Sequence, residues 1–125
     1  MGLTEAQALD DYANNAVRAA CRANDEKNDW TAITAEILNR HSSSPSFFHA
    51  EGMRFHLPAY LIADLDNAYK HEFAYHLCGP SEKFSLLTRL QRSSVELYLR
   101  AICERGNMVS YQHDVKRALE EWAAF

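Results

Sequence analysis

The stretch Glu51-Gly-Met-Arg-Phe-His-Leu-Pro-Ala-Tyr60 decides the fold of this chain, because it sets a proline inside a region of helical periodicity. The proline ring clashes with the carbonyl four residues earlier and offers no N–H, which costs about 3 kcal/mol in a helix interior. A proline in the first turn of a helix avoids that cost. We therefore expect Pro58 to begin a new helix and the chain to turn a corner at Leu57 or Pro58.

The helix predicted from Pro58 is the central one, and it should end at Gly79-Pro80, where glycine accepts a left-handed turn and proline cannot continue a helix. Its apolar face carries Leu61, Leu65, Ala68, Tyr69, Phe73, His76 and Leu77. At its start, we expect Tyr60 to be buried with its hydroxyl hydrogen-bonded. The His56 ring, across the proline corner, is the expected partner.

Two further helices are predicted before this segment. Thr4-Glu-Ala-Gln7 has the spacing of a capping box, which predicts a helix over 5–23. Asp29 can cap a second helix over 30–40.

Two helices are predicted after the central segment, and both show apolar residues at helical spacing. The capping box Thr88-Arg-Leu-Gln91 begins one that Gly106 closes, and the last covers 110–124. No segment alternates with period two, so no strand is expected. The sequence predicts an all-α bundle of five or six helices, a single domain over 1–125, with the first helix against the last.

Composition narrows the class of protein. With 125 residues and 47% apolar content, the chain supports one hydrophobic core. The apolar run near Pro58 is broken by Asp64, far short of the roughly 20 residues that span a membrane. Cys21, Cys78 and Cys103 are scattered, which is typical of reduced thiols in a cytoplasmic protein.

The net charge is −4, and residues 1–66 hold 10 Asp and Glu against 5 Lys and Arg. No clustered basic face is predicted, so nucleic acid is not an expected partner. The acidic half suits a basic protein partner. The candidate contact residues are Asp10, Asp11, Asp25, Glu26 and Asp29, together with Tyr75 as an exposed aromatic.

His71 and His76 are five residues apart, whereas the helical zinc motif needs four. On a helix their rings would differ by about 140°, so no shared metal and no cofactor is expected. One of the two histidines should be interior and the other at the surface. Asp64 and Asp66 should be solvated or paired with Lys70.

The order Gly52, Arg54, Phe55, His56, Leu57, Pro58, Ala59, Tyr60 resembles a motif of small bacterial proteins known only as a domain of unknown function. The resemblance covers mainly residues 47–67, with a weaker echo from Phe84 to Val95. It implies a bacterial cytosolic protein of this size. It implies no activity, and the motif residues Arg54, Phe55, His56, Pro58 and Tyr60 are interpreted as architectural.

Three functions fit these features. The first is a protein-binding module, such as an immunity protein that neutralises a basic toxin domain. The second is a metal-dependent or acid/base enzyme that uses His56, Tyr60, His71 and His76. The third is a self-associating structural protein.

Overall fold

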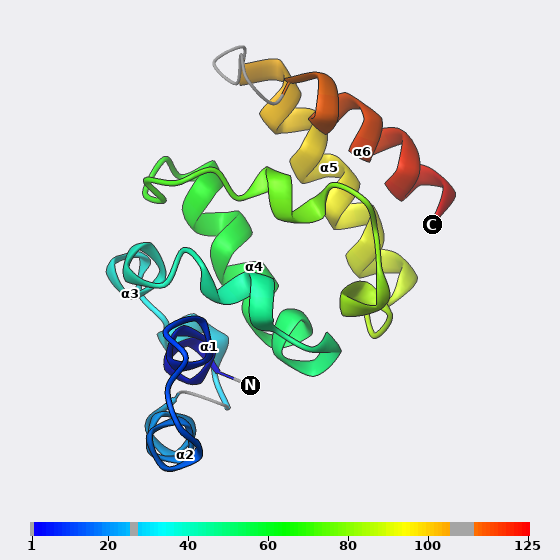
Figure 1. The fold of residues 1–125 in the computed structure, drawn as a ribbon. Coiled ribbons are helices and arrows are strands. Elements are labelled where there is room, and N and C mark those ends of the chain that lie inside the picture. The colour runs from blue at the N-terminus through cyan, green and yellow to red at the C-terminus, as the bar shows by residue number, and fades with distance from the viewer. Residues whose placement is uncertain (1, 26–27, 106–111) are drawn as a thin grey trace.

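The computed structural model describes residues 2–25, 28–105 and 112–125, and this part of the chain is helical, with no strand (Figure 1). This confirms the all-α prediction. The α-helices are α1 (Leu3–Asp10), α2 (Asn15–Asn24), α3 (Ala35–Arg40), α4 (Ala50–Leu65), α5 (Arg89–Arg105) and α6 (Gln112–Ala124). Short 3-10 helices are η1 (Trp30–Ala32), η2 (Ser44–Phe47), η3 (Ala74–Leu77) and η4 (Glu82–Phe84).

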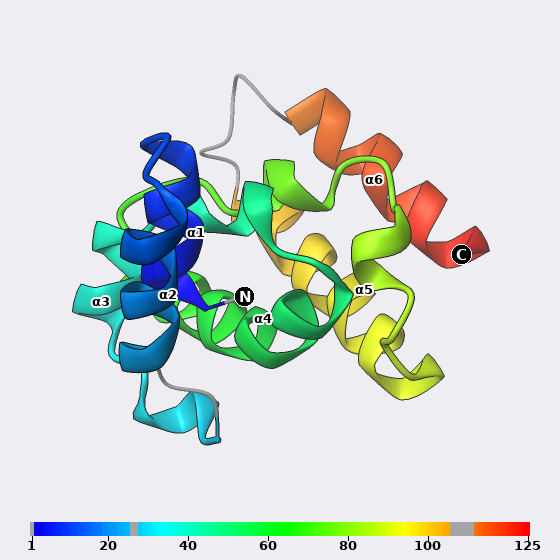
Figure 2. The same ribbon diagram turned by 60° about the horizontal axis from the view of Figure 1, so that its bottom comes forward.

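Helix α4 lies in the middle of the molecule, with α1 to α3 on one side and α5 with α6 on the other (Figures 1 and 2). Helices α5 and α6 pack side by side as a hairpin, and α1 packs on α2 and η2. The predicted contact between the first and last helices is wrong. Both views place α1 and α6 on opposite sides of α4, so each terminal region packs on its own neighbours.

The helix predicted over 5–23 is two helices, because Tyr12 adopts a left-handed conformation with φ 58°. The N–H of Ala13 bonds to the carbonyl of Ala8 at 2.9 Å, which is the six-to-one bond of a Schellman helix end. Asn14 then caps α2, and its side chain accepts a hydrogen bond from the Val17 N–H at 2.9 Å.

The capping box predicted at Thr4 is also wrong, since α1 begins two residues earlier than predicted, at Leu3, and its N-cap is Gly2. The second predicted helix is divided as well. Asp29 caps η1 as expected, accepting from the Thr31 N–H at 3.0 Å, but the chain extends at Ile33 and α3 starts only after Thr34.

Pro58 does not begin a helix. It lies inside α4, which runs without a corner from Ala50 to Leu65. The carbonyl of Arg54 therefore has no N–H four residues ahead of it. Burial on the same helix outweighs this cost, because Met53, Leu57 and Tyr60 are all in the core.

The central helix ends at Leu65 and does not continue to Leu77. Asn67 takes a left-handed conformation with φ 60°, and the Ala68 N–H bonds to the Ala63 carbonyl at 2.8 Å. The Asn39 side chain of α3 then binds the segment that follows α4. It donates to the Ala68 carbonyl at 2.9 Å and accepts from the Lys70 N–H at 2.6 Å.

The remaining helix signals were correct. Gly79 has φ 76°, the predicted left-handed turn, although it follows η3 and not a long helix. In the Thr88–Gln91 capping box, the Thr88 N–H donates to the Gln91 side chain at 2.8 Å and the Gln91 N–H donates to the Thr88 hydroxyl at 3.1 Å. Gly106, the predicted end of the helix after Thr88, and residue 110, the predicted start of the last helix, lie outside the described residues.

Tyr60 forms the centre of the core, as predicted: it is fully buried, and its hydroxyl is hydrogen-bonded. The acceptor is the His41 carbonyl at 2.7 Å, and not the His56 ring. The Tyr60 ring stacks on Phe73 at 4.9 Å and meets Tyr69 edge-on at 5.5 Å. These contacts fasten the segment after α4 against α4 itself.

Candidate protein-binding groove

An apolar groove of about 390 Å³ runs between α4 and α5. It is the candidate functional site, because it joins large apolar side chains that are only half-buried. The lining residues come from both helices and the turn before α5. They are Arg54, Leu57, Pro58, Leu61, Ile62, Leu65, Leu87, Gln91, Ser94, Val95, Leu97 and Tyr98.

The α4 wall of this groove follows one helical face, from Arg54 to Leu65, at spacings of three, one, three, one and three residues. At 1.5 Å per residue this face is about 17 Å long, or three turns. Leu57 and Leu61 form its floor and are buried. Ile62 and Leu65 form its rim and remain 49% and 42% exposed, so the placement of Leu65 on a buried stripe was wrong.

The α5 wall has the same division into floor and rim. Val95 and Tyr98 are buried, whereas Leu97 is 66% exposed. Leu90, two turns before Leu97 on the same side of α5, is 79% exposed. Both walls therefore offer apolar side chains to a ligand that covers the groove from above.

Arg54 is the only charged residue in the groove lining. Its side chain is exposed and makes no hydrogen bond or ion pair with the residues that the structure describes. Arg54, Pro58 and Gln91 also line a neighbouring pocket of about 790 Å³. That pocket adds Trp30 and Phe55 to the surface, so the groove continues beyond the arginine into a wider space with aromatic walls.

A buried polar network fixes α4 against α5 at the other end of the groove. The Tyr98 hydroxyl donates to the Asp64 carboxylate, and Arg105 bonds both that carboxylate, at 3.4 Å, and the Asp64 carbonyl, at 2.5 Å. Burial and the Asp64 charge raise the pKa of Tyr98 well above its usual range. Asp64 is thus neither solvated nor paired with Lys70, because α5 supplies both of its side-chain partners.

His56, from the sequence motif, does not line the groove itself, although it lines the wider pocket next to it. Its ring stacks on Phe48 at 4.5 Å, and its Nδ1 is 2.7 Å from the Gly52 carbonyl, so Nδ1 carries the proton. Its Nε2 is buried and has no partner among the described residues, and burial lowers the pKa of the ring. The predicted bond to Tyr60 is wrong, because the Tyr60 hydroxyl donates to the His41 carbonyl and His56 Nδ1 donates to the Gly52 carbonyl.

His71 and His76 do not share a helix, so the helical comparison behind their prediction does not apply. His71 is exposed, while His76 is partly buried beside Phe73. Burial is the main cause that lowers the pKa of His76 to about 4. Within the described ranges, no three His, Cys, Asp or Glu side chains come together in an arrangement that could hold a metal ion.

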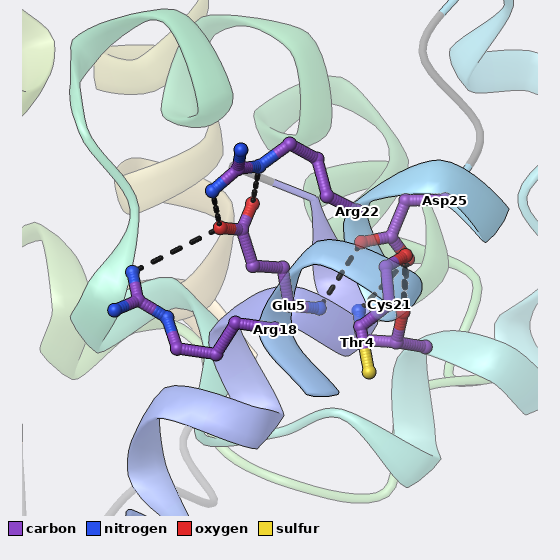
Figure 3. A network of polar contacts seen from close by, with 6 residues as sticks. All are labelled: Thr4, Glu5, Arg18, Cys21, Arg22 and Asp25. Atoms are coloured by element: carbon purple, nitrogen blue, oxygen red, sulfur yellow. Dashed lines mark hydrogen bonds and ion pairs between the residues drawn. The ribbon is translucent and has the colours of Figure 1, made fainter. Parts of the chain in front are cut away.

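The acidic residues predicted to meet a partner are only partly available for one. Asp25 is turned inward, and its carboxylate accepts from the Thr4 and Glu5 N–H groups at 2.9 and 3.1 Å (Figure 3). Asp29 caps η1. Asp11 is exposed at the end of α1, beside the half-exposed Asp10. Glu26 lies outside the described residues, and the partner-binding role of this set and of the exposed Tyr75 stays a prediction.

Sequence reasoning missed Glu5, which is 2% exposed and joins α1 to α2. Arg22 donates two hydrogen bonds to its carboxylate, at 3.0 and 2.6 Å, and Arg18 lies 3.8 Å away (Figure 3). The bond to Arg22 is the main cause that lowers the pKa of Glu5. The available signal in the sequence was the pair Arg18 and Arg22, which share one face of α2. This signal points to Glu5 only if the chain is known to turn back at Tyr12.

No helix in the described part of the chain has the length and apolar content needed to cross a bilayer. Comparisons with curated proteins and with solved structures give no match. A family model does match, over residues 1–124, well beyond the stretch around Pro58 on which the resemblance rested. The chain therefore belongs to DUF6714, a family of unknown function.

Proposed function

We propose that this protein is a binding module that docks a partner protein in the groove between α4 and α5. The observation that carries the proposal is the exposure of Ile62, Leu65 and Leu97 along one continuous apolar channel. Complete burial of one such side chain is favourable by about 1.5–3 kcal/mol relative to full exposure to water. Each of these three is already partly buried, so covering it would contribute part of that free energy to binding. The proposal keeps the class of function expected from the sequence and moves the interface.

The groove suits binding because its floor and one end are already fixed. Asp64, Tyr98 and Arg105 hold the two helices together at that end, and the floor residues are buried in the core. A surface that is ordered before the partner arrives loses less conformational entropy on binding. A basic partner at Asp10 and Asp11, including a toxin domain, remains a separate prediction that this surface does not require.

Site-specific photo-crosslinking tests the proposal. A benzophenone amino acid replaces Leu97 in the groove or Val17 on α2, and both proteins are expressed in the cells that naturally produce this chain. Val17 is 47% exposed and belongs to α2, which lies on the opposite side of α4 from α5 (Figures 1 and 2). We expect a protein that crosslinks at position 97 and not at position 17.

Binding by the purified pair then decides the matter. Ile62→Asp should raise the dissociation constant at least tenfold, and the matched exposed variant Val17→Asp should leave it unchanged. Circular dichroism checks that both variants keep the helical fold. Equal crosslinking at both positions, or a dissociation constant that Ile62→Asp does not change, would refute docking in this groove.

A further inference from the structure

We infer that the partner segment is an amphipathic helix of about three turns, from another protein, with an acidic side chain placed against Arg54. This inference rests on the proposed function and names the kind of ligand that the groove takes. It draws on the spacing of the lining residues, on the charge of the lining and on the exposure of the rim.

The spacing of the lining residues points to a helix. The α4 face from Arg54 to Leu65 is about 17 Å long, and the α5 wall from Gln91 to Tyr98 repeats the spacing of three and four residues. Side chains at these spacings form ridges and grooves that another helix fills with its own. A helix of 12 to 14 residues, about 18–21 Å long, matches this length, with apolar residues at positions such as i, i+3, i+4 and i+7.

The charge of the lining points to an acidic residue in that helix. Arg54 forms no ion pair with a carboxylate of the described residues, and the wider pocket next to it also contains Arg22. Glu51 is the only acidic residue that lines that pocket. A carboxylate on the partner would pair with Arg54 through charge-assisted hydrogen bonds. Because Arg54 stands at one end of an otherwise uncharged groove, this pair would also set the direction in which the partner helix lies.

The same charge argues against a second copy of this chain as the occupant. Two grooves placed face to face would cover both Arg54 side chains without pairing either, because the lining supplies no carboxylate. A fatty acid would satisfy Arg54, but one acyl chain covers only the floor. Ile62, Leu65 and Leu97 on the rim would stay exposed, whereas a helix covers both rims at once.

A display library of random 14-residue peptides tests the inference directly. The immobilised protein is the bait, and peptides that also bind Ile62→Asp are removed. We expect the enriched peptides to carry apolar residues at three-and-four spacing and Asp or Glu near one end. With Arg54→Glu as the bait, Lys or Arg should replace the acidic residue. A selected acidic peptide should lose about tenfold in affinity for Arg54→Glu, and a peptide with the reversed charge should recover it.

The outcomes separate this inference from the proposed function. Enriched peptides without helical spacing, or with a composition that Arg54→Glu does not change, would overturn the inference and leave docking in the groove intact. No enrichment over Ile62→Asp would overturn the inference, and the crosslinking experiment would then decide the proposed function by itself. If light scattering shows a dimer that Leu97→Asp dissociates, the groove would be assigned to a second copy of this chain. If no peptide is selected and the protein binds decanoate in a way that Arg54→Gln abolishes, the groove would be assigned to a fatty acid.

Discussion

The carboxylate of Asp25 accepts hydrogen bonds from both the backbone N–H and the hydroxyl of Thr4, at 2.9 and 2.7 Å. A residue that follows α2 thereby caps the first turn of α1. Because a lost cap costs about 0.5–2 kcal/mol, we expect Asp25→Ala to lower the free energy of unfolding by about 1–2 kcal/mol in urea denaturation. Asp10→Ala, on the same helix, should change it by less than about 0.5 kcal/mol. Equal losses for the two variants would show that Asp25 is not a cap.

Tyr60→Phe should destabilise the protein by about 1–2 kcal/mol. The change removes the hydrogen bond to the His41 carbonyl at 2.7 Å and leaves that oxygen only the Ser44 N–H, at 3.2 Å, among the described residues. Tyr12→Phe is the control, because Tyr12 is 95% exposed, and its loss should stay under about 0.5 kcal/mol. The measurement is thermal or urea unfolding, and a stability of Tyr60→Phe within 0.5 kcal/mol of the parent protein would argue against a strong bond.

Leu61→Ala and Leu65→Ala should differ clearly although both leucines lie on α4. Leu61 is in the core, so its truncation leaves a cavity and should cost about 2–4 kcal/mol. Leu65 lies on the exposed rim, so its truncation should cost less than about 1 kcal/mol. Urea unfolding of the two variants measures the difference. Similar losses would mean that the groove is closed at this end in solution.

Stability should fall as the pH is lowered from about 6.5 towards 4, and His76 should be a main cause. Burial lowers its pKa in the folded protein to about 4, whereas the unfolded chain binds the proton near pH 6.5. The unfolded state therefore holds more protons in this range, and the free energy of unfolding decreases by up to about 1.4 kcal/mol per pH unit for this group.

Urea unfolding at pH 7, 6 and 5 measures this dependence. His76→Gln should flatten it, and the exposed His71→Gln should not. Part of the slope should remain in His76→Gln, because burial also lowers the pKa values of His41 and His56. An unchanged slope in His76→Gln would mean that the His76 ring reaches solvent in the folded protein.

The parts of the fold that the sequence predicted correctly depend on neighbours in the chain. The capping box of Thr88 and Gln91 needs only residues three apart, and it forms as expected. Thr4 and Gln7 have the same spacing, but the Asp25 carboxylate, 21 residues away from Thr4, takes the hydroxyl. A local signal of equal strength therefore succeeds or fails according to a distant side chain.

Two of the missed helix ends have a common cause. Tyr12 and Asn67 both adopt left-handed conformations that close a helix, although glycine is the residue expected there. Pro58 misled in the opposite direction, since burial of α4 compensates a proline in its interior. Tertiary packing decides these positions, and the sequence by itself does not reveal that packing.

The groove could not be predicted from one sequence because it belongs to two helices. Leu90 and Leu97 share the apolar pattern of α5 with Val95 and Tyr98, yet they are 79% and 66% exposed while the other two are buried. The spacing in the sequence does not distinguish the two pairs. Arg54 was assigned an architectural role, and only the structure reveals that its side chain forms no hydrogen bond or ion pair with the described residues.

The central place of α4 determines how the protein can come apart. The α1–α3 region and the α5–α6 hairpin both pack against it, so neither can detach without exposing part of the α4 surface. Amide protons in the middle of α4, around Tyr60 and Leu61, should exchange with solvent only in global unfolding, while those of α2 exchange through smaller openings. The helix that supplies one wall of the groove would then be the most persistent part of the native state.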